Sequence, residues 1–227
     1  QHYSSRVFAA EIAERTKPVD PILAKAQSLL LEMLRCGVPN SEIGITGSAL
    51  IGAHRAESDL DFVLYTREAF RTVQQVVASA GESYRLGQGD WQSAFDRRQA
   101  SISLEEYVWH ESRKHNKLMI DGTKVDFGLQ SVPGTWRPRG HVKKLRPVCF
   151  QAEVLNADFA FDTPARWVVD WETASEVVCW TATYVGQAFA GERVEVSGWL
   201  EETDRGNQVV VGTSREAASE YIRVLRS

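Results

Sequence analysis

Residues 44–65 read GITGSALIGAHRAESDLDFVLY, and this stretch puts two carboxylates where a strand normally carries apolar side chains. Asp59 and Asp61 lie one residue apart at the start of the apolar run LDFVLY. Alternate side chains of a strand point to the same face. The two aspartates therefore project together, and the apolar side chains Leu60, Phe62 and Leu64 project to the opposite face.

Composition is that of a soluble globular protein, with 227 residues, 43% hydrophobic and 25% charged. The net charge of −4 gives no overall attraction to nucleic acid or to an anionic membrane, so any polyanion site must be a local patch. Cys36, Cys149 and Cys179 form no CxxC pair, which favours neither a disulfide framework nor a zinc site and suits the cytoplasm. No run of about 18 apolar residues predicts a membrane span.

Alternating helix and strand signals fill residues 20–130. Asp20–Pro21 opens a helix that Gly37 ends. A short strand, the helical SALIGA and the strand DLDFVLY follow. The order of further elements is a helix over 67–80, two helices within 90–116, and a hairpin over 118–129 turning at Asp121–Gly122. We expect an α+β domain with a mixed sheet.

The amino-acid composition changes near residue 131. Residues 131–146 are rich in Pro, Gly, Lys and Arg and predict a basic linker. Several short strand-like runs follow, and SREAASEYIRVL predicts a closing helix. The expected organisation is an N-terminal extension (1–19), a catalytic domain (20–130), the linker (131–146) and a β-rich domain (147–227). The last is expected to be a small antiparallel β-barrel, with an OB-like form as one candidate.

A third carboxylate, Asp126, lies in the strand-like run KVDFGL. Two carboxylates as close as Asp59 and Asp61 repel each other at a cost of about 1 kcal/mol, which favours a bound cation. Oxygen ligands favour Mg²⁺ or Mn²⁺. If Asp126 lies on a strand beside DLDFVLY, three carboxylates converge, and two ions about 3.5–4 Å apart could clamp a phosphoryl group. Asp121 is the alternative third acid, although Asp–Gly fits a turn better.

Gly47–Ser48 supplies donors for the other half of a phosphate site. Glycine lets the backbone approach a phosphate closely, and the Ser48 hydroxyl and the amides of the following turn can hydrogen-bond to an anion. A nucleoside triphosphate with its metals would fit between this turn and the aspartate strand. A Gly–Ser pair alone is usually only a turn, so the prediction depends on the ordered combination with the aspartates.

This combination resembles the DNA-polymerase-β-like nucleotidyltransferase superfamily. The resemblance rests on Gly47, Ser48, Asp59, Asp61 and Asp126 and covers about residues 20–130. The whole chain is similar to the two-domain nucleotidyltransferases predicted in archaea and bacteria. The stretches VWHESRKHNK and TYVGQAFAGERVEVSGWLEE add to that likeness.

The resemblance implies transfer of a nucleoside monophosphate from an NTP or dNTP to an acceptor hydroxyl, with release of pyrophosphate. Asp59 and Asp61 would bind two Mg²⁺ or Mn²⁺ ions. Asp126 would bind the catalytic ion and help to deprotonate or orient the acceptor. Ser48 and the neighbouring amides would hold the β- and γ-phosphates.

Three further cations are candidates for the triphosphate. Arg55 precedes the aspartate strand, and Arg113 and Lys114 lie in HESRKHNK. The alternatives are an exposed loop for Arg55 and a solvated helix end for the other two. The spacing of His54, His110 and His115 does not favour a metal site.

The basic linker is a candidate nucleic-acid contact beside Trp136. Its cations are Arg137, Arg139, Lys143, Lys144 and Arg146. The alternative is a solvated linker. The sequence leaves the oligomeric state open, and it leaves the acceptor open between a nucleic-acid 3′ end, a small molecule and a protein hydroxyl. The rival hypothesis is a non-catalytic nucleotide- or nucleic-acid-binding module that keeps the fold.

Overall fold

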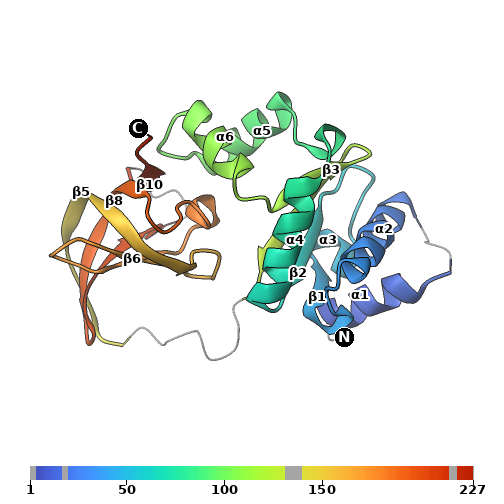
Figure 1. The fold of residues 1–227 in the computed structure, drawn as a ribbon, viewed down its shortest axis with the longest axis horizontal. Coiled ribbons are helices and arrows are strands. Elements are labelled where there is room, and N and C mark those ends of the chain that lie inside the picture. The colour runs from blue at the N-terminus through green and yellow to red at the C-terminus, as the bar shows by residue number, and fades with distance from the viewer. Residues whose placement is uncertain (1–3, 17–19, 131–139, 215–218, 227) are drawn as a thin grey trace. The chain divides into compact units, whose positions relative to one another are not determined.

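The computed structural model describes residues 4–16, 20–130, 140–214 and 219–226, and these form an α+β protein (Figure 1). The chain divides into two compact units. The first comprises Gln1–Gly87 and Lys114–Val132, and the second comprises Gln88–Arg113 and Pro133–Ser227.

The first unit is built around a mixed sheet with the strand order β1–β2–β4–β3. Strands β1 and β2 are antiparallel, β2 and β4 are parallel, and β3 and β4 form an antiparallel hairpin. The elements are α1 (Ser5–Glu14), α2 (Pro21–Arg35), β1 (Ile43–Thr46), α3 (Gly47–Leu50), β2 (Leu60–Leu64), α4 (Arg67–Ser79), β3 (Lys117–Ile120) and β4 (Thr123–Leu129).

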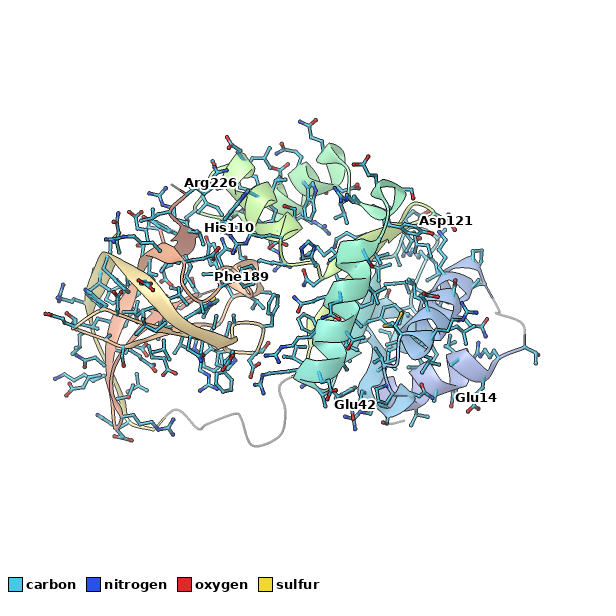
Figure 2. The ribbon with its side chains drawn as sticks, in the orientation of Figure 1. Glu14, Glu42, His110, Asp121, Phe189 and Arg226 are labelled. Carbon is cyan, nitrogen blue, oxygen red and sulfur yellow. The ribbon has the colours of Figure 1, made fainter. Side chains whose placement is uncertain are left out.

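The local signals explain where these elements begin and end. The Asp20 side chain accepts a hydrogen bond from the Leu23 amide at 3.0 Å and caps α2, with Pro21 in the first turn. The β3–β4 turn places Asp121 at φ 44° and Gly122 at φ 76°, the left-handed pair that a two-residue hairpin requires. Figure 2 labels Asp121 at this turn. The predicted helix and hairpin are therefore confirmed.

One face of the sheet forms the core of the first unit. Leu60, Phe62 and Leu64 are at most 1% exposed, which confirms the alternation expected for β2. The Phe62 and Phe127 rings stack with centroids 5.5 Å apart, so they tie β2 to β4. Helix α4 packs against β2 and β4.

Helix α1 makes the expected N-terminal extension an integral part of the first unit. It packs against β1 and α2, and Ala9 and Ile12 are almost fully buried. A Cβ atom added to Gly44 would lie 2.9 Å from both Ser5 Oγ and Val63 Cγ2, so α1 approaches the sheet on the Val63 side. No local pattern indicates this contact, because it depends on a glycine distant in the chain.

The second unit contains a sheet with the strand order β10–β8–β5–β6–β7–β9. An additional β8–β9 pairing closes a ring of hydrogen bonds through β5, β6, β7, β9 and β8. The β7–β9 pairing is parallel, and the others are antiparallel. The elements are α5 (Gln88–Arg98), α6 (Leu104–Ser112), β5 (Val142–Phe159), β6 (Ala165–Val169), β7 (Glu176–Cys179), β8 (Arg193–Thr203), β9 (Gly206–Val211) and β10 (Tyr221–Val224).

Two helices were expected within residues 90–116, and α5 and α6 confirm them, but they are grouped with the second unit rather than with residues 20–87. The reason is a set of long-range contacts. The Ser101 amide donates to Tyr184 Oη at 3.1 Å, and the Val224 amide donates to His110 Nε2 at 3.3 Å. These partners lie far along the chain, so sequence order alone did not indicate the grouping.

The predictions of a linker to residue 146 and of a closing helix are wrong in part. Strand β5 begins at Val142, where its first residues pair with the end of β8, for example Val142 with Thr203. Residues 221–224 form β10 rather than a helix, because they pair with β8 in register Ile222 to Val196. Cross-strand partners outweighed the local helical spacing.

No helix within the described ranges is long and apolar enough to cross a membrane. The cytoplasmic location stays a prediction.

Candidate functional site

Strands β2 and β4 bring the three predicted carboxylates to one face of the first sheet. Asp61 lies in β2 and pairs in register with Asp126 of the parallel strand β4. Asp59 directly precedes β2. Because Leu60, Phe62, Val125 and Phe127 are buried on the opposite face, the aspartates share the half-buried face. The parallel pairing that sequence analysis made conditional is present.

The rival third acid, Asp121, does not belong to this group. It lies at the β3–β4 turn, is exposed, and contacts Lys25 only through its backbone oxygen, at 2.7 Å. Its left-handed conformation serves the hairpin, so Asp126 is the third carboxylate of the site.

The Gly47–Ser48 turn abuts Asp61. Gly47 has φ 65°, and a Cβ atom there would lie only 2.2 Å from Asp61 Oδ2. No side chain fits between the backbone and this carboxylate, so the turn requires glycine for space as well as for conformation. Ser48 is half-buried in the first turn of α3. The structure thus brings the two halves of the predicted site together.

Two lysines that sequence analysis did not assign to the carboxylates lie among them. Lys124 pairs with Asp126 Oδ2, and its Nζ is 3.5 Å from Asp59 Oδ2. Lys117 Nζ lies 3.9 Å from Asp126 Oδ1. The signal for Lys124 was present in KVDFGL, since it lies two residues before Asp126 and must share its face.

Negative charge is incompletely balanced at Asp61. Burial raises the pKa of the Asp61 carboxyl, the charges of Asp126 and Asp59 raise it further, and Lys124 opposes them. No ion pair among the described residues involves Asp61. The buried Oδ1 atom of Asp126 accepts no hydrogen bond. A cation beside these oxygens would neutralise the charge at Asp61 and provide a partner for Asp126 Oδ1, so the residues fit a divalent ion.

No three His, Cys, Asp or Glu side chains of the described ranges are already gathered in the arrangement of a metal site. The Lys124 ammonium group, rather than a fourth carboxylate, lies between Asp59 and Asp126.

A cavity of about 390 Å³ adjoins the other end of α3. Its lining includes Val7 and Phe8 of α1, Leu50 and Ile51 at the end of α3, and His54. His54 Nε2 bonds Asp20 Oδ2 at 3.0 Å, while the buried His54 Nδ1 atom makes no hydrogen bond. The four-residue helix α3 therefore contacts Asp61 at its start and a mainly apolar cavity at its end.

The three predicted phosphate cations do not all belong to the same unit. Arg55 is exposed in the loop before β2. Lys114 is 2% exposed, and its backbone oxygen accepts from Gln74 Nε2 at 2.8 Å. Arg113 belongs to the second unit, where its guanidinium pairs with Glu192 at 2.5 Å and stacks over the Phe189 ring, which Figure 2 labels. Of the histidines considered, His54 belongs to the first unit and His110 to the second.

The basic segment has its own partners in β5. Lys143 Nζ lies 3.8 Å from a Glu202 oxygen, and Lys144 Nζ lies 3.7 Å from the centre of the Trp199 ring. Arg146 pairs in register with Leu200 and is exposed. Arg137 and Arg139 lie outside the described residues. Acidic residues outnumber basic ones between residues 140 and 226 of the sequence.

Comparison with known proteins gives one informative relative. The chain is 33% identical over 218 residues to the uncharacterized protein MJ1086 of Methanocaldococcus jannaschii, an alignment that covers 89% of this chain. The chain spans 64% of that relative's length. No family model and no solved structure matches the chain.

Proposed function

We propose that the first unit is a metal-dependent nucleotidyltransferase of the polymerase-β-like type. The observation that carries this proposal is the contact between two motifs distant in sequence. Gly47 is in van der Waals reach of the Asp61 carboxylate, and Asp61 is in register with Asp126 on the neighbouring strand. A glycine turn thus adjoins Asp61, one of three carboxylates that share a face of the sheet.

In this proposal Asp59, Asp61 and Asp126 hold two Mg²⁺ or Mn²⁺ ions. When bound, the ions neutralise the charge that develops on the transferring phosphoryl group and on the leaving pyrophosphate. Ser48 and the neighbouring amides bind the β- and γ-phosphates of an NTP or dNTP. Asp126, on the central β4, orients the acceptor hydroxyl toward the α-phosphate. The acceptor can be a nucleic-acid 3′ end, a small molecule or a protein hydroxyl.

The rival hypothesis, a non-catalytic binding module, explains less well why Asp61 lies beside two other carboxylates. A module that only binds phosphate gains nothing from three carboxylates beside the phosphate turn, because like charges repel. A site that binds divalent ions needs them. The raised pKa of Asp61 therefore supports the metal-dependent proposal.

For the second unit we propose an OB-like fold. The support is the ring of five strands, β5–β6–β7–β9–β8, whose first and last members pair. OB-like units bind oligonucleotides on one face, but this likeness concerns fold alone.

The test is pyrophosphate release by the full chain incubated with mixed NTPs and Mn²⁺, with and without an oligonucleotide primer. We expect release by the wild type and background release by Asp61→Asn. Asp121→Asn is the matched control, because it removes an exposed carboxylate of the same unit and asparagine tolerates its left-handed conformation. Equal release by wild type and Asp61→Asn would contradict the proposal.

A further inference from the structure

Lys124 occupies the position between two carboxylates that a metal would need. It lies on β4, and its ammonium group pairs with Asp126 of the same strand and with Asp59, 3.5 Å away, ahead of β2. Its side chain is only 14% exposed. The bond to Asp59 links β4 to the residue ahead of β2, so this lysine holds the two acids together without any metal ion.

The pairing leaves Asp61 with the unbalanced charge. Lys124 is within ion-pair distance of Asp59 and Asp126, and no ion pair among the described residues reaches Asp61. Lys117 approaches Asp126 from the opposite oxygen, at 3.9 Å. Acids and bases therefore share this face, and Asp61 is the acid of the three that forms no ion pair within the described ranges.

An ammonium group and a divalent ion cannot share the same carboxylate oxygens, because their charges repel strongly at contact distance. A free divalent ion that binds the Oδ2 atoms of Asp59 and Asp126 must therefore displace Lys124 and leave this largely buried ammonium group without an anion. A nucleoside triphosphate changes this balance, since its phosphates offer Lys124 a new partner. The displaced ammonium group and the incoming metal are then neutralised together.

We propose that Lys124 is a built-in cation that holds Asp59 and Asp126 in the metal-free protein and turns to the triphosphate when the metal–nucleotide complex binds. The site consequently takes metal and nucleotide together and discriminates against free metal. This inference rests on the proposed function, and it assigns Lys124 a positioning role within it.

The experiment measures Mn²⁺ binding to the full chain by the electron paramagnetic resonance signal of free Mn²⁺. One series has no nucleotide, and the other has a non-hydrolysable nucleoside triphosphate. We expect Lys124→Met to bind free Mn²⁺ about tenfold more tightly than the wild type, because its internal competitor is gone. With the analogue present, the advantage should vanish or reverse, so the coupling between metal and nucleotide falls.

Lys25→Met is the matched control. Lys25 donates to the Asp121 backbone oxygen and to Thr123 Oγ1 at the start of β4, and it contacts no site carboxylate. It should bind Mn²⁺ as the wild type does. Lys124→Arg keeps the charge and provides a second variant if Lys124→Met fails to fold. It should bind free Mn²⁺ no more tightly than the wild type.

The outcomes separate this inference from the function on which it rests. Unchanged or weaker binding of free Mn²⁺ by Lys124→Met would overturn the role of Lys124, and pyrophosphate release by the wild type would then leave the nucleotidyltransferase proposal standing. Absence of both Mn²⁺ binding and pyrophosphate release in all proteins would overturn both. Tighter Mn²⁺ binding by Lys124→Met without any pyrophosphate release would support the role proposed for Lys124. It would count against the nucleotidyltransferase proposal.

Discussion

Two carboxylates, one in each unit, have opposite surroundings. Glu195 of β8 accepts hydrogen bonds from Tyr221 Oη at 2.7 Å and from Arg223 Nε and Nη2 at 3.0 and 2.7 Å. These bonds, that of Tyr221 foremost, lower the pKa of Glu195. Asp61 of β2 has no such partner in the part of the chain that the structure describes, and burial beside two further acids raises its pKa.

The difference separates a carboxylate that stabilises the fold from one suited to a ligand. Glu195 tightens the β8–β10 pairing because its charge is neutralised within the protein. Asp61 is held beside Asp59 and Asp126 at an electrostatic cost that a bound cation would reduce. In this comparison the neutralised Glu195 belongs to the framework of β8 and β10, and Asp61 belongs to the candidate site.

The largest expected effect comes from breaking the Gly47–Asp61 contact. Gly47→Ala introduces a Cβ atom that must push the Asp61 carboxylate aside, and a displacement of this size at a reacting centre costs about 100-fold in rate. Gly52→Ala is the matched control, because Gly52 has φ 68° yet no atom within 4 Å of an added Cβ. The measurement is pyrophosphate release, and equal losses in both variants would attribute the effect to backbone strain alone.

A smaller effect is expected at Glu195. Glu195→Gln removes the charge that Tyr221 and Arg223 bind and should lower the free energy of unfolding by about 2 kcal/mol at neutral pH. Because the folded pKa is lowered, this stability is present above the ordinary value of 4.5 and is lost as pH falls through the folded value. Calorimetric measurement of the unfolding free energy from about pH 3 to about pH 7 checks this, because that range includes the ordinary pKa of a glutamate.

The exposed Glu153 on β5 provides the control for that series. Glu153→Gln should leave the unfolding temperature of the second unit unchanged. A loss of stability as large as that of Glu195→Gln would mean that the general acidity of this unit, rather than the Glu195 bonds, sets its pH response.

The aspartates of the site should respond to neutralisation with opposite signs. Asp61→Asn should raise the metal-free free energy of unfolding at neutral pH by about 1 kcal/mol, because it removes a repelled charge. The raised pKa of Asp61 means that its stabilising, protonated form is present below 3.8 and is lost as pH rises through the folded value. The gap between wild type and Asp61→Asn should therefore open as pH rises.

Asp126→Asn should instead lower metal-free stability by about 1 kcal/mol, because Lys124 and Lys117 lose their shared partner. Melting curves in the presence of a chelator measure both variants. Stabilisation by Asp126→Asn, or destabilisation by Asp61→Asn, would contradict the distribution of charge described for this face.

The smallest effect is expected in the basic segment. Lys143 and Glu202 form an ion pair with both side chains more than half exposed, at 65% and 56%. Lys143→Ala should change the free energy of unfolding by less than about 0.5 kcal/mol. Thermal unfolding of the two proteins in low salt measures the difference. A loss near that of Glu195→Gln would show that exposed pairs also contribute substantially to this unit.

The sequence by itself predicted the first sheet's main parts. Period-two alternation in DLDFVLY placed Asp59 and Asp61 on the face opposite Leu60 and Phe62, because burial follows the pleat. The Asp121–Gly122 turn, the cap at Asp20 and the position of Asp126 on a strand were equally local. Each of these features depends on neighbouring residues, so a short stretch of sequence is enough to predict it.

Only the tertiary structure decided which distant residues meet. In the folded protein β2 pairs with β4, Lys124 lies between Asp59 and Asp126, and Gly47 lies against Asp61. The tertiary structure also turned residues 221–224 into a strand, since pairing with β8 and the bonds to Glu195 outweigh a weak helical preference. Such contacts form between segments far apart in the chain, and their free energies depend on packing and charge that no local pattern contains.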